Sequence, residues 1–127
     1  MNINPKLLKN VNEQLDNKQD KGTLLYTNSN IGTAFSPQTL NFNDTYSYYD
    51  IIIAQDGAIL KTCRVFPGDT SVDYILENNL NGFIRTRPCT VYTNKIVFKD
   101  AIFYETYNNY STNNSQCIPY KIIGYKN

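Results

Sequence analysis

Tyrosine side chains give this sequence its most distinctive chemistry. Eleven of the 127 residues are tyrosine and none is tryptophan. A phenol ring has an apolar face and a hydroxyl at its edge, which suits stacking on sugar rings or filling a protein interface. Covering the rim of a small β-domain is the alternative use of such rings. The candidates for binding a glycan or a protein partner are Tyr46, Tyr48, Tyr104, Tyr107 and Tyr110.

Two arginines extend this candidate site. Arg85 and Arg87 are two positions apart in a predicted strand, so their side chains face the same way. Such guanidinium groups are able to bind an acidic partner or a carbohydrate. The alternatives are a solvated face or one half of ion pairs between subunits.

The residues that usually carry catalysis are sparse. Histidine is absent, which removes the commonest general base and the commonest metal ligand. Hydrolysis of a sugar linkage needs two carboxyl groups held a few ångströms apart. Most of the acidic residues instead stand beside turn residues, where aspartate caps its own backbone. The sequence therefore predicts no enzyme, and the alternative is a small glycan-degrading enzyme that uses an acid such as Glu77 or Glu105.

The charge balance and the cysteines exclude further classes. Twelve Lys and Arg stand against eleven Asp and Glu, a net charge of +1, which excludes an electrostatic nucleic-acid binder. No apolar run approaches the length of a membrane span, so we expect no membrane insertion. Cys63, Cys89 and Cys117 are odd in number and far apart, which fits neither a closed disulfide framework nor a zinc site. We expect them to be small buried hydrophobes, and we expect no metal or cofactor.

A β-rich domain is predicted from Thr23 to the end of the chain, because short runs of β-forming residues are separated by turn residues. Gln55-Asp56-Gly57 is typical of a tight hairpin, Val72–Leu80 has apolar residues at helical spacing, and Asn108–Ser115 has the composition of an exposed loop. The pattern predicts a mainly β fold, an antiparallel β-sandwich or jelly-roll-like domain. The expected strands are Thr23–Thr27, Gln38–Phe42, Tyr48–Ala54, Ala58–Phe66, Gly82–Arg87, Thr90–Phe98, Ala101–Tyr107 and Cys117–Tyr125.

The first 22 residues differ from the rest and predict one short N-terminal helix. Asn4 is a typical N-cap, and the helix is expected over residues 5–20. Its apolar positions Leu8, Val11 and Leu15 have the spacing of a short coiled-coil seam. So polar a helix needs copies of itself or a docking surface, and the alternatives are that it folds back on its own β-domain or frays. The expected organisation is a stalk or anchor over residues 1–22 and a β-rich head over residues 23–127.

Several segments resemble a domain found in virion proteins of bacteriophages and prophages. The similar segments near the start are Leu24–Asn30, Thr33–Leu40 and Tyr49–Ile53, and Cys117–Lys126 is similar to the Ile-Pro strand and Gly-Tyr-Lys tail on which such proteins close. Asn17–Gly22 resembles the stalk-to-head junctions of phage fibres. The sequence departs from the pattern at Tyr26, where tryptophan is usual.

The resemblance implies a structural appendage of the virion, made in the cytoplasm of the host bacterium. It implies a homotrimer, a head fibre or capsid-decoration protein with the helix as stalk and the β-domain as an outward knob that aids attachment to host surface glycans. The alternatives are the receptor-binding tip of a tail fibre or baseplate, or a docking module that binds only other virion proteins such as capsid or tail. No catalytic residue is implied.

Overall fold

The computed structural model describes Asn4, Lys6 and residues 21–127. The expected helix over residues 5–20 and its seam residues Leu8, Val11 and Leu15 lie outside the described residues. The domain expected from residue 23 onward lies within them.

The described part is mainly β, as predicted, and all its strand pairs are antiparallel. A single 3₁₀ turn, η1 (Leu80–Gly82), interrupts the strands within this part. The strands are β1 (Thr23–Thr27), β2 (Gln38–Asn41), β3 (Tyr48–Gln55), β4 (Ala58–Val65), β5 (Ser71–Asn78), β6 (Ile84–Tyr92), β7 (Lys95–Phe98), β8 (Ile102–Thr106), β9 (Asn109–Thr112) and β10 (Ile118–Tyr125).

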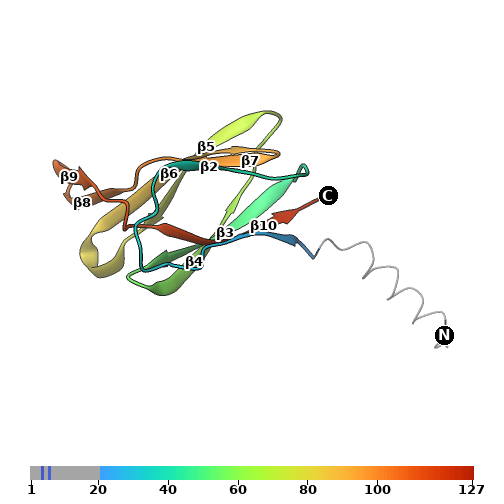
Figure 1. The fold of residues 1–127 in the computed structure, drawn as a ribbon, viewed down its shortest axis with the longest axis horizontal. Helices are drawn as coiled ribbons and strands as arrows, with labels where there is room; N and C mark the ends of the chain where they lie inside the picture. The colour runs from blue at the N-terminus through green and yellow to red at the C-terminus, as the bar shows by residue number, and fades with distance from the viewer. Residues whose placement is uncertain (1–3, 5, 7–20) are drawn as a thin grey trace.

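The strands form two sheets (Figure 1). The four-stranded sheet has the order β1-β10-β3-β4, so the first and last strands are neighbours. The six-stranded sheet has the order β2-β7-β6-β8-β9, with β5 paired to the other edge of β6. β6 is therefore the central strand: β5 pairs with it from Asn78↔Arg85 to Ser71↔Tyr92, while β8 and β7 share its opposite edge.

One hydrophobic core contains side chains from both sheets. It follows from alternation along the strands, because every second residue of a strand points to the same face. Tyr49, Ile51 and Ile53 of β3 are fully buried. Val91 of β6 and Phe98 of β7 come from the other sheet and belong to the same cluster. The core also takes in the loop residue Phe35, whose ring meets Phe98 edge to face at 5.5 Å, and its remaining buried members are Tyr46, Val65, Leu76, Cys89, Ile96, Cys117, Ile118 and Ile122.

Three local predictions need correction, and the first concerns the strands expected on either side of Pro88, Gly82–Arg87 and Thr90–Phe98. Residues 84–92 form one continuous strand, β6, and the second expected strand is divided between β6 and β7, which pair with each other. Pro88 lacks an N–H, but β8 pairs only with residues 84–86 of β6 and β7 only with residues 89–91. The carbonyl of Pro88 accepts the Lys99 N–H at 3.0 Å, so the missing N–H faces the same edge, at the gap between β8 and β7. The Lys99 carbonyl, which an N–H at residue 88 would face, instead accepts a hydrogen bond from Arg87 Nη1 at 3.0 Å, so the proline leaves no unpaired acceptor there.

The other two corrections concern segments that pair as strands. Val72–Leu80 was expected to turn helically, but most of it lies in β5, which matches β6 in register over its whole length. Val72, Tyr74 and Leu76 also fit a period of two, and pairing with β6 decides between the two periods. Asn108–Ser115 was expected to be a loop, but β9 lies within it and pairs with β8. The hairpin at Asp56-Gly57 is confirmed, with φ of 54° and 79° at these two residues.

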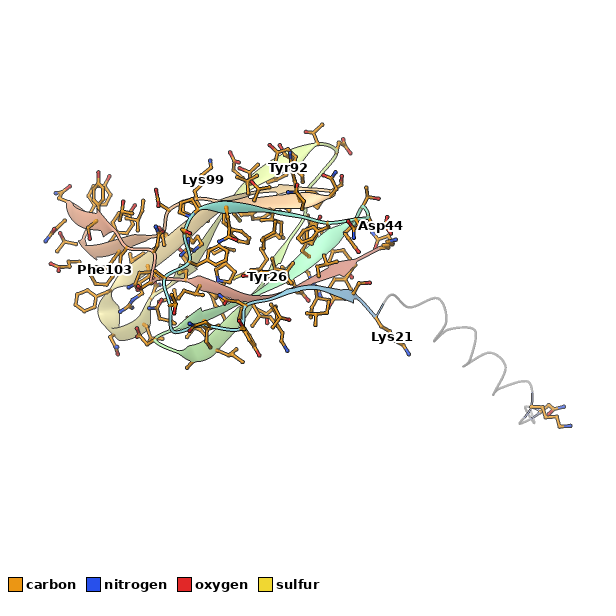
Figure 2. The ribbon with its side chains drawn as sticks, viewed as in Figure 1. Lys21, Tyr26, Asp44, Tyr92, Lys99 and Phe103 are labelled. Carbon is orange, nitrogen blue, oxygen red and sulfur yellow. The ribbon has the colours of Figure 1, made fainter. Side chains whose placement is uncertain are left out.

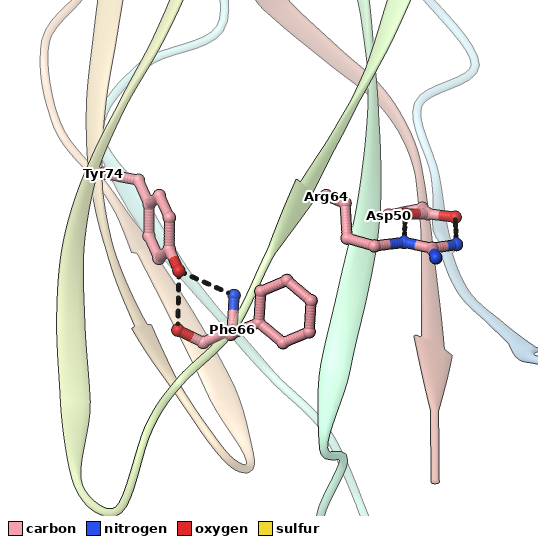
Figure 3. A network of polar contacts seen from close by, with 4 residues as sticks. All are labelled: Asp50, Arg64, Phe66 and Tyr74. Atoms are coloured by element: carbon pink, nitrogen blue, oxygen red, sulfur yellow. Dashed lines mark hydrogen bonds and ion pairs between the residues drawn. The ribbon is translucent and has the colours of Figure 1, made fainter. Parts of the chain in front are cut away.

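Polar groups join the two sheets at two places, and those at the second are buried. In Figure 3 the Tyr74 hydroxyl of β5 donates to the Phe66 carbonyl and accepts its N–H, both at 2.9 Å, just after β4. At the other end of β5, Asn78 donates to Gln55 of β3 at 3.2 Å, and Gln55 donates to Gln116 at 2.9 Å. The bonds of Tyr74 and Asn78 link β5 of the six-stranded sheet to the four-stranded sheet and fix the relative position of the two sheets.

Arg87 of β6 holds the long connection before β10 in place. Its side chain is fully buried and donates to four main-chain carbonyls, two from Nη2, with its guanidinium 5.2 Å from the centre of the Phe35 ring. Burial lowers the pKa of Arg87 to about 10. The four acceptors, at 2.9 to 3.0 Å, are the carbonyls of Lys99, Asn114, Gln116 and Cys117.

Replacing Arg87 tests this role. Arg87→Leu leaves buried carbonyls without donors, so we expect the free energy of unfolding to fall by about 3 to 5 kcal/mol. Arg87→Lys keeps the charge but not the planar fork, and we expect it to lose stability as well. Unfolding in urea measures both. Lys99→Leu changes an exposed side chain nearby and is the control, with an expected effect within about 0.5 kcal/mol. A loss below about 1 kcal/mol for Arg87→Leu would contradict the role.

Candidate functional site

The domain has two distinct ends. The β8–β9 hairpin forms one end of its long axis, and the start of β1 lies toward the other (Figure 1). Figure 2 labels Phe103 of β8 near the first end and Lys21 near the second. Near Lys21, Gly22 lies so close to β10 that an added Cβ would meet Ile123 at 2.6 Å and Tyr125 at 2.7 Å. The chain therefore enters the domain at the end far from the β8–β9 hairpin.

A groove of about 490 Å³ lies on the outer face of the six-stranded sheet, toward the β8–β9 end. We call it the tyrosine groove. It is built from outward positions of three neighbouring strands: Glu77 of β5 pairs with Thr86 of β6, and Ile84 of β6 pairs with Tyr104 of β8. Its lining residues are Ile75, Glu77, Gly82, Ile84, Thr86, Tyr104, Glu105, Thr106 and Tyr107.

The lining of the tyrosine groove is unusually apolar for an exposed surface. Tyr107 is 90% exposed, Ile75 65% and Ile84 47%. Tyr110 lies beside Tyr104 with ring centres 5.2 Å apart, so it supports the groove from β9. Contiguous exposed apolar surface of this kind marks an interaction site. The volume is also within the range of about 300 to 1,000 Å³ that is usual for ligand pockets.

Two carboxylates and no cationic side chain line the groove. Glu77 comes from β5, and Glu105 from the point where the register of β8 and β9 shifts. The Glu105 carboxylate accepts a hydrogen bond from Asn109 Nδ2 at 3.0 Å. A carboxylate has about four acceptor positions, so Glu105 keeps capacity for a ligand.

The structure corrects the expectation for Arg85 and Arg87. They do face the same way, but that way is inward, and their exposed fractions are 8% and 0%. Arg85 donates to the Leu80 carbonyl at 2.7 Å and its guanidinium lies 5.3 Å from the centre of the Phe103 ring. Neither arginine reaches the outer face, because outward positions of β6 alternate with theirs. Both arginines therefore stabilise the fold and do not line the groove.

Tyr46 is also displaced from the expected surface site. Its ring is 7% exposed and packs in the core, 5.8 Å from Tyr49 and 6.4 Å from Phe42 between ring centres. It borders a second hollow, of about 620 Å³, beside the C-terminal residue. That hollow contains none of the other candidate tyrosines, and it is lined by Thr45, Tyr46, Ser47, Phe66, Pro67, Gly68, Asp69, Thr93, Lys126 and Asn127.

Tyr48 belongs to a third place, on the outer face of the four-stranded sheet. Its ring stacks on Tyr125 at 4.8 Å and 12°. The Arg64 guanidinium lies 4.8 Å from the Tyr48 ring centre and donates twice to the Asp50 carboxylate, at 2.8 and 2.9 Å (Figure 3). The candidate residues thus divide, and only Tyr104, Tyr107 and the neighbouring Tyr110 come together.

Sequence reasoning missed Ile75, Ile84 and Thr86 as members of a site. Ile75 lies in the segment with helical spacing. Ile84 and Thr86 alternate along β6 with the candidate site residues Arg85 and Arg87. The signal was the period of two along both strands, and it becomes readable once β5 and β6 are known to pair.

Cys89 and Cys117 are buried, as predicted, whereas Cys63 is half-buried. All three cysteines are free thiols. Burial raises the pKa of Cys117 to about 11. In the described part of the chain, no group of three or more His, Cys, Asp and Glu could hold a metal ion. Nor does any helix among the described residues have the length and apolarity to cross a membrane.

Comparison with known proteins finds no matching family model, curated protein or solved structure.

Removing the Asp50 carboxylate tests the Arg64 contact. Hydrogen bonds from Arg64 hold the pKa of Asp50 below its usual range. Unfolded aspartate titrates near pH 3.9, so this stabilisation is present above about pH 4 and disappears as the pH falls through the lower folded pKa. We expect Asp50→Asn to flatten the acid side of the stability profile, measured by urea unfolding from about pH 7 to pH 2. Asp69→Asn removes an exposed carboxylate and should leave the profile unchanged; equal profiles for both variants and the parent would exclude the effect.

Proposed function

We propose that this chain is a structural appendage protein of a bacteriophage virion, a homotrimeric head fibre or capsid-decoration protein that aids attachment to host surface glycans. The resemblance of Leu24–Asn30, Thr33–Leu40 and Cys117–Lys126 to virion domains is one support. The other is the position of the tyrosine groove, at the end of the domain far from Lys21.

The position of the groove carries the proposal. A head attached to the virion through its N-terminal segment presents its far end to the surroundings. At that end the chain has exposed tyrosine rings, threonine hydroxyls and two carboxylates around one groove. Aromatic faces with a few polar groups at their edges suit a sugar ring, which has apolar faces and a hydroxyl rim. The two sheets and their shared core support a β-sandwich as the form of this head.

Trimerisation through Leu8, Val11 and Leu15 raises the overall affinity of such a site for a glycan. A single shallow groove binds a sugar weakly. Three grooves on one stalk raise the overall affinity, because the second and third contacts form at high effective concentration. The same reasoning applies to the tip of a tail fibre or baseplate, which is the runner-up position in the virion.

Two other functions would use the same groove. A docking module would cover Ile75 and Ile84, which are exposed and apolar, with another virion protein. A glycan-degrading enzyme is favoured by one observation, that Glu77 and Glu105 line the same groove. Release of reducing sugar from a bound polysaccharide, abolished in Glu77→Gln or Glu105→Gln, would establish the enzyme.

Removing a groove tyrosine tests the glycan site. We expect the wild-type chain to bind members of an array of bacterial surface polysaccharides, and Tyr107→Ala to weaken each contact about two- to tenfold. Tyr107 is 90% exposed, so the variant should unfold at the parent temperature. Tyr48→Ala removes a ring from the other sheet and should bind as the parent does. Binding that survives Tyr107→Ala and Tyr104→Ala would place the site elsewhere, and an array without any binding would favour the docking module.

The oligomeric state tests the stalk. Light scattering on the full chain should give three times the 14.6 kDa of one chain. Replacing Leu8 and Leu15 together by asparagine places polar side chains in the seam and should give monomers. Asn10→Ser, outside the seam, is the control. A monomeric parent would remove the trimer from the proposal.

A further inference from the structure

We propose that the tyrosine groove selects saccharides with a free, protonated amine and rejects anionic saccharides. This inference rests on the proposed function and adds the chemical class of the ligand. It depends on how charge is distributed over β5, β6 and β8.

The strand β6 forms the floor of the groove and contributes no charge to it. Its outward residues are Ile84 and Thr86, while its two arginines point inward. The guanidinium of Arg85 is held under the sheet by the Leu80 carbonyl and the Phe103 ring. Arg87 is fully buried and bonded to four carbonyls. The positive charge of β6 is thus kept on the face opposite the groove.

The two charges that do line the groove are both negative and stand on opposite sides of that floor. Glu77 is on β5 and Glu105 is on β8, with β6 between them. Neighbouring strands are about 4.8 Å apart, so the two carboxylate-bearing strands are about 10 Å apart. A sugar lying over Ile84 and Thr86 therefore has a carboxylate on either side.

Such an arrangement discriminates by charge. An ammonium group on the sugar can donate to either carboxylate, and charged hydrogen bonds are about twice as strong as neutral ones. A carboxylate or phosphate on the sugar would meet like charge without a cation to offset it, which costs free energy. An N-acetylated or plain hydroxylated sugar keeps the stacking on Tyr104 and Tyr107 but gains no ion pair.

Isothermal titration of the full chain with three oligosaccharides of equal length tests the proposal. The probes are a glucosamine oligomer, an N-acetylglucosamine oligomer and a galacturonic acid oligomer. We expect the glucosamine oligomer to bind about tenfold more tightly than the N-acetylated one, and the acidic oligomer to show no binding. The preference should shrink as salt is added, because exposed charges are screened.

Charge-neutral variants separate the groove from general attraction. Glu77→Gln and Glu105→Gln should each move the ratio of the two affinities toward one, because each weakens binding of the glucosamine oligomer more than binding of the N-acetylated oligomer. Asp69→Asn makes the same charge change beside the C-terminal hollow and should leave the ratio unchanged. Tyr107→Ala should weaken both oligomers together.

Each result decides the question. Equal affinity for the two glucosamine probes, tighter binding of the acidic probe, or a ratio unaffected by both glutamate variants overturns the amine preference while the glycan-binding function stands. If none of the three probes binds, the amine preference also fails. The polysaccharide array with Tyr107→Ala then decides the proposed function separately.

Discussion

The guanidinium of Arg87 is the interaction on which the rest of this structure depends. It is buried without a carboxylate bonded to it, and its charge is stabilised by four main-chain carbonyls. Taking a cation out of water is costly, so the arrangement persists only because its hydrogen bonds are satisfied together. Three of those carbonyls belong to residues 114–117, which lead into β10. Since β10 pairs with β1 and β3, one side chain of the six-stranded sheet secures the centre of the other.

The same alternation that buries Arg87 creates the outer surface of β6. A strand that sends Arg85, Arg87 and Cys89 inward must send Ile84 and Thr86 outward. The outward set is apolar or uncharged, and β5 and β8 add glutamates and tyrosines at its sides. The two buried arginines and the apolar outer groove thus lie on opposite faces of the same strand. This explains why an apolar patch stays exposed on a small domain whose interior contains two arginines.

The placement of the groove links the fold to the proposed biology. The chain enters the domain beside β10, at Gly22, while the hairpin that supplies Tyr104, Tyr107 and Tyr110 lies at the far end. A carrier attached through the N-terminal segment would leave this hairpin outermost. The Arg64 contact with Tyr48 and Asp50 lies on the other sheet and serves as surface structure, since each group in it already has a partner.

The sequence by itself determined the class of the domain, most strand positions and the Asp56-Gly57 hairpin, because alternation and turn chemistry are local properties. It also predicted that Arg85 and Arg87 share a face. Only the tertiary structure decided that this face is the buried one, because burial depends on which side of the strand the other sheet packs against. The continuity of β6 through Pro88 and the strand β9 were equally beyond the sequence, because each depends on where a partner strand begins and ends. The tyrosine groove joins residues of three strands, and their register brings them together.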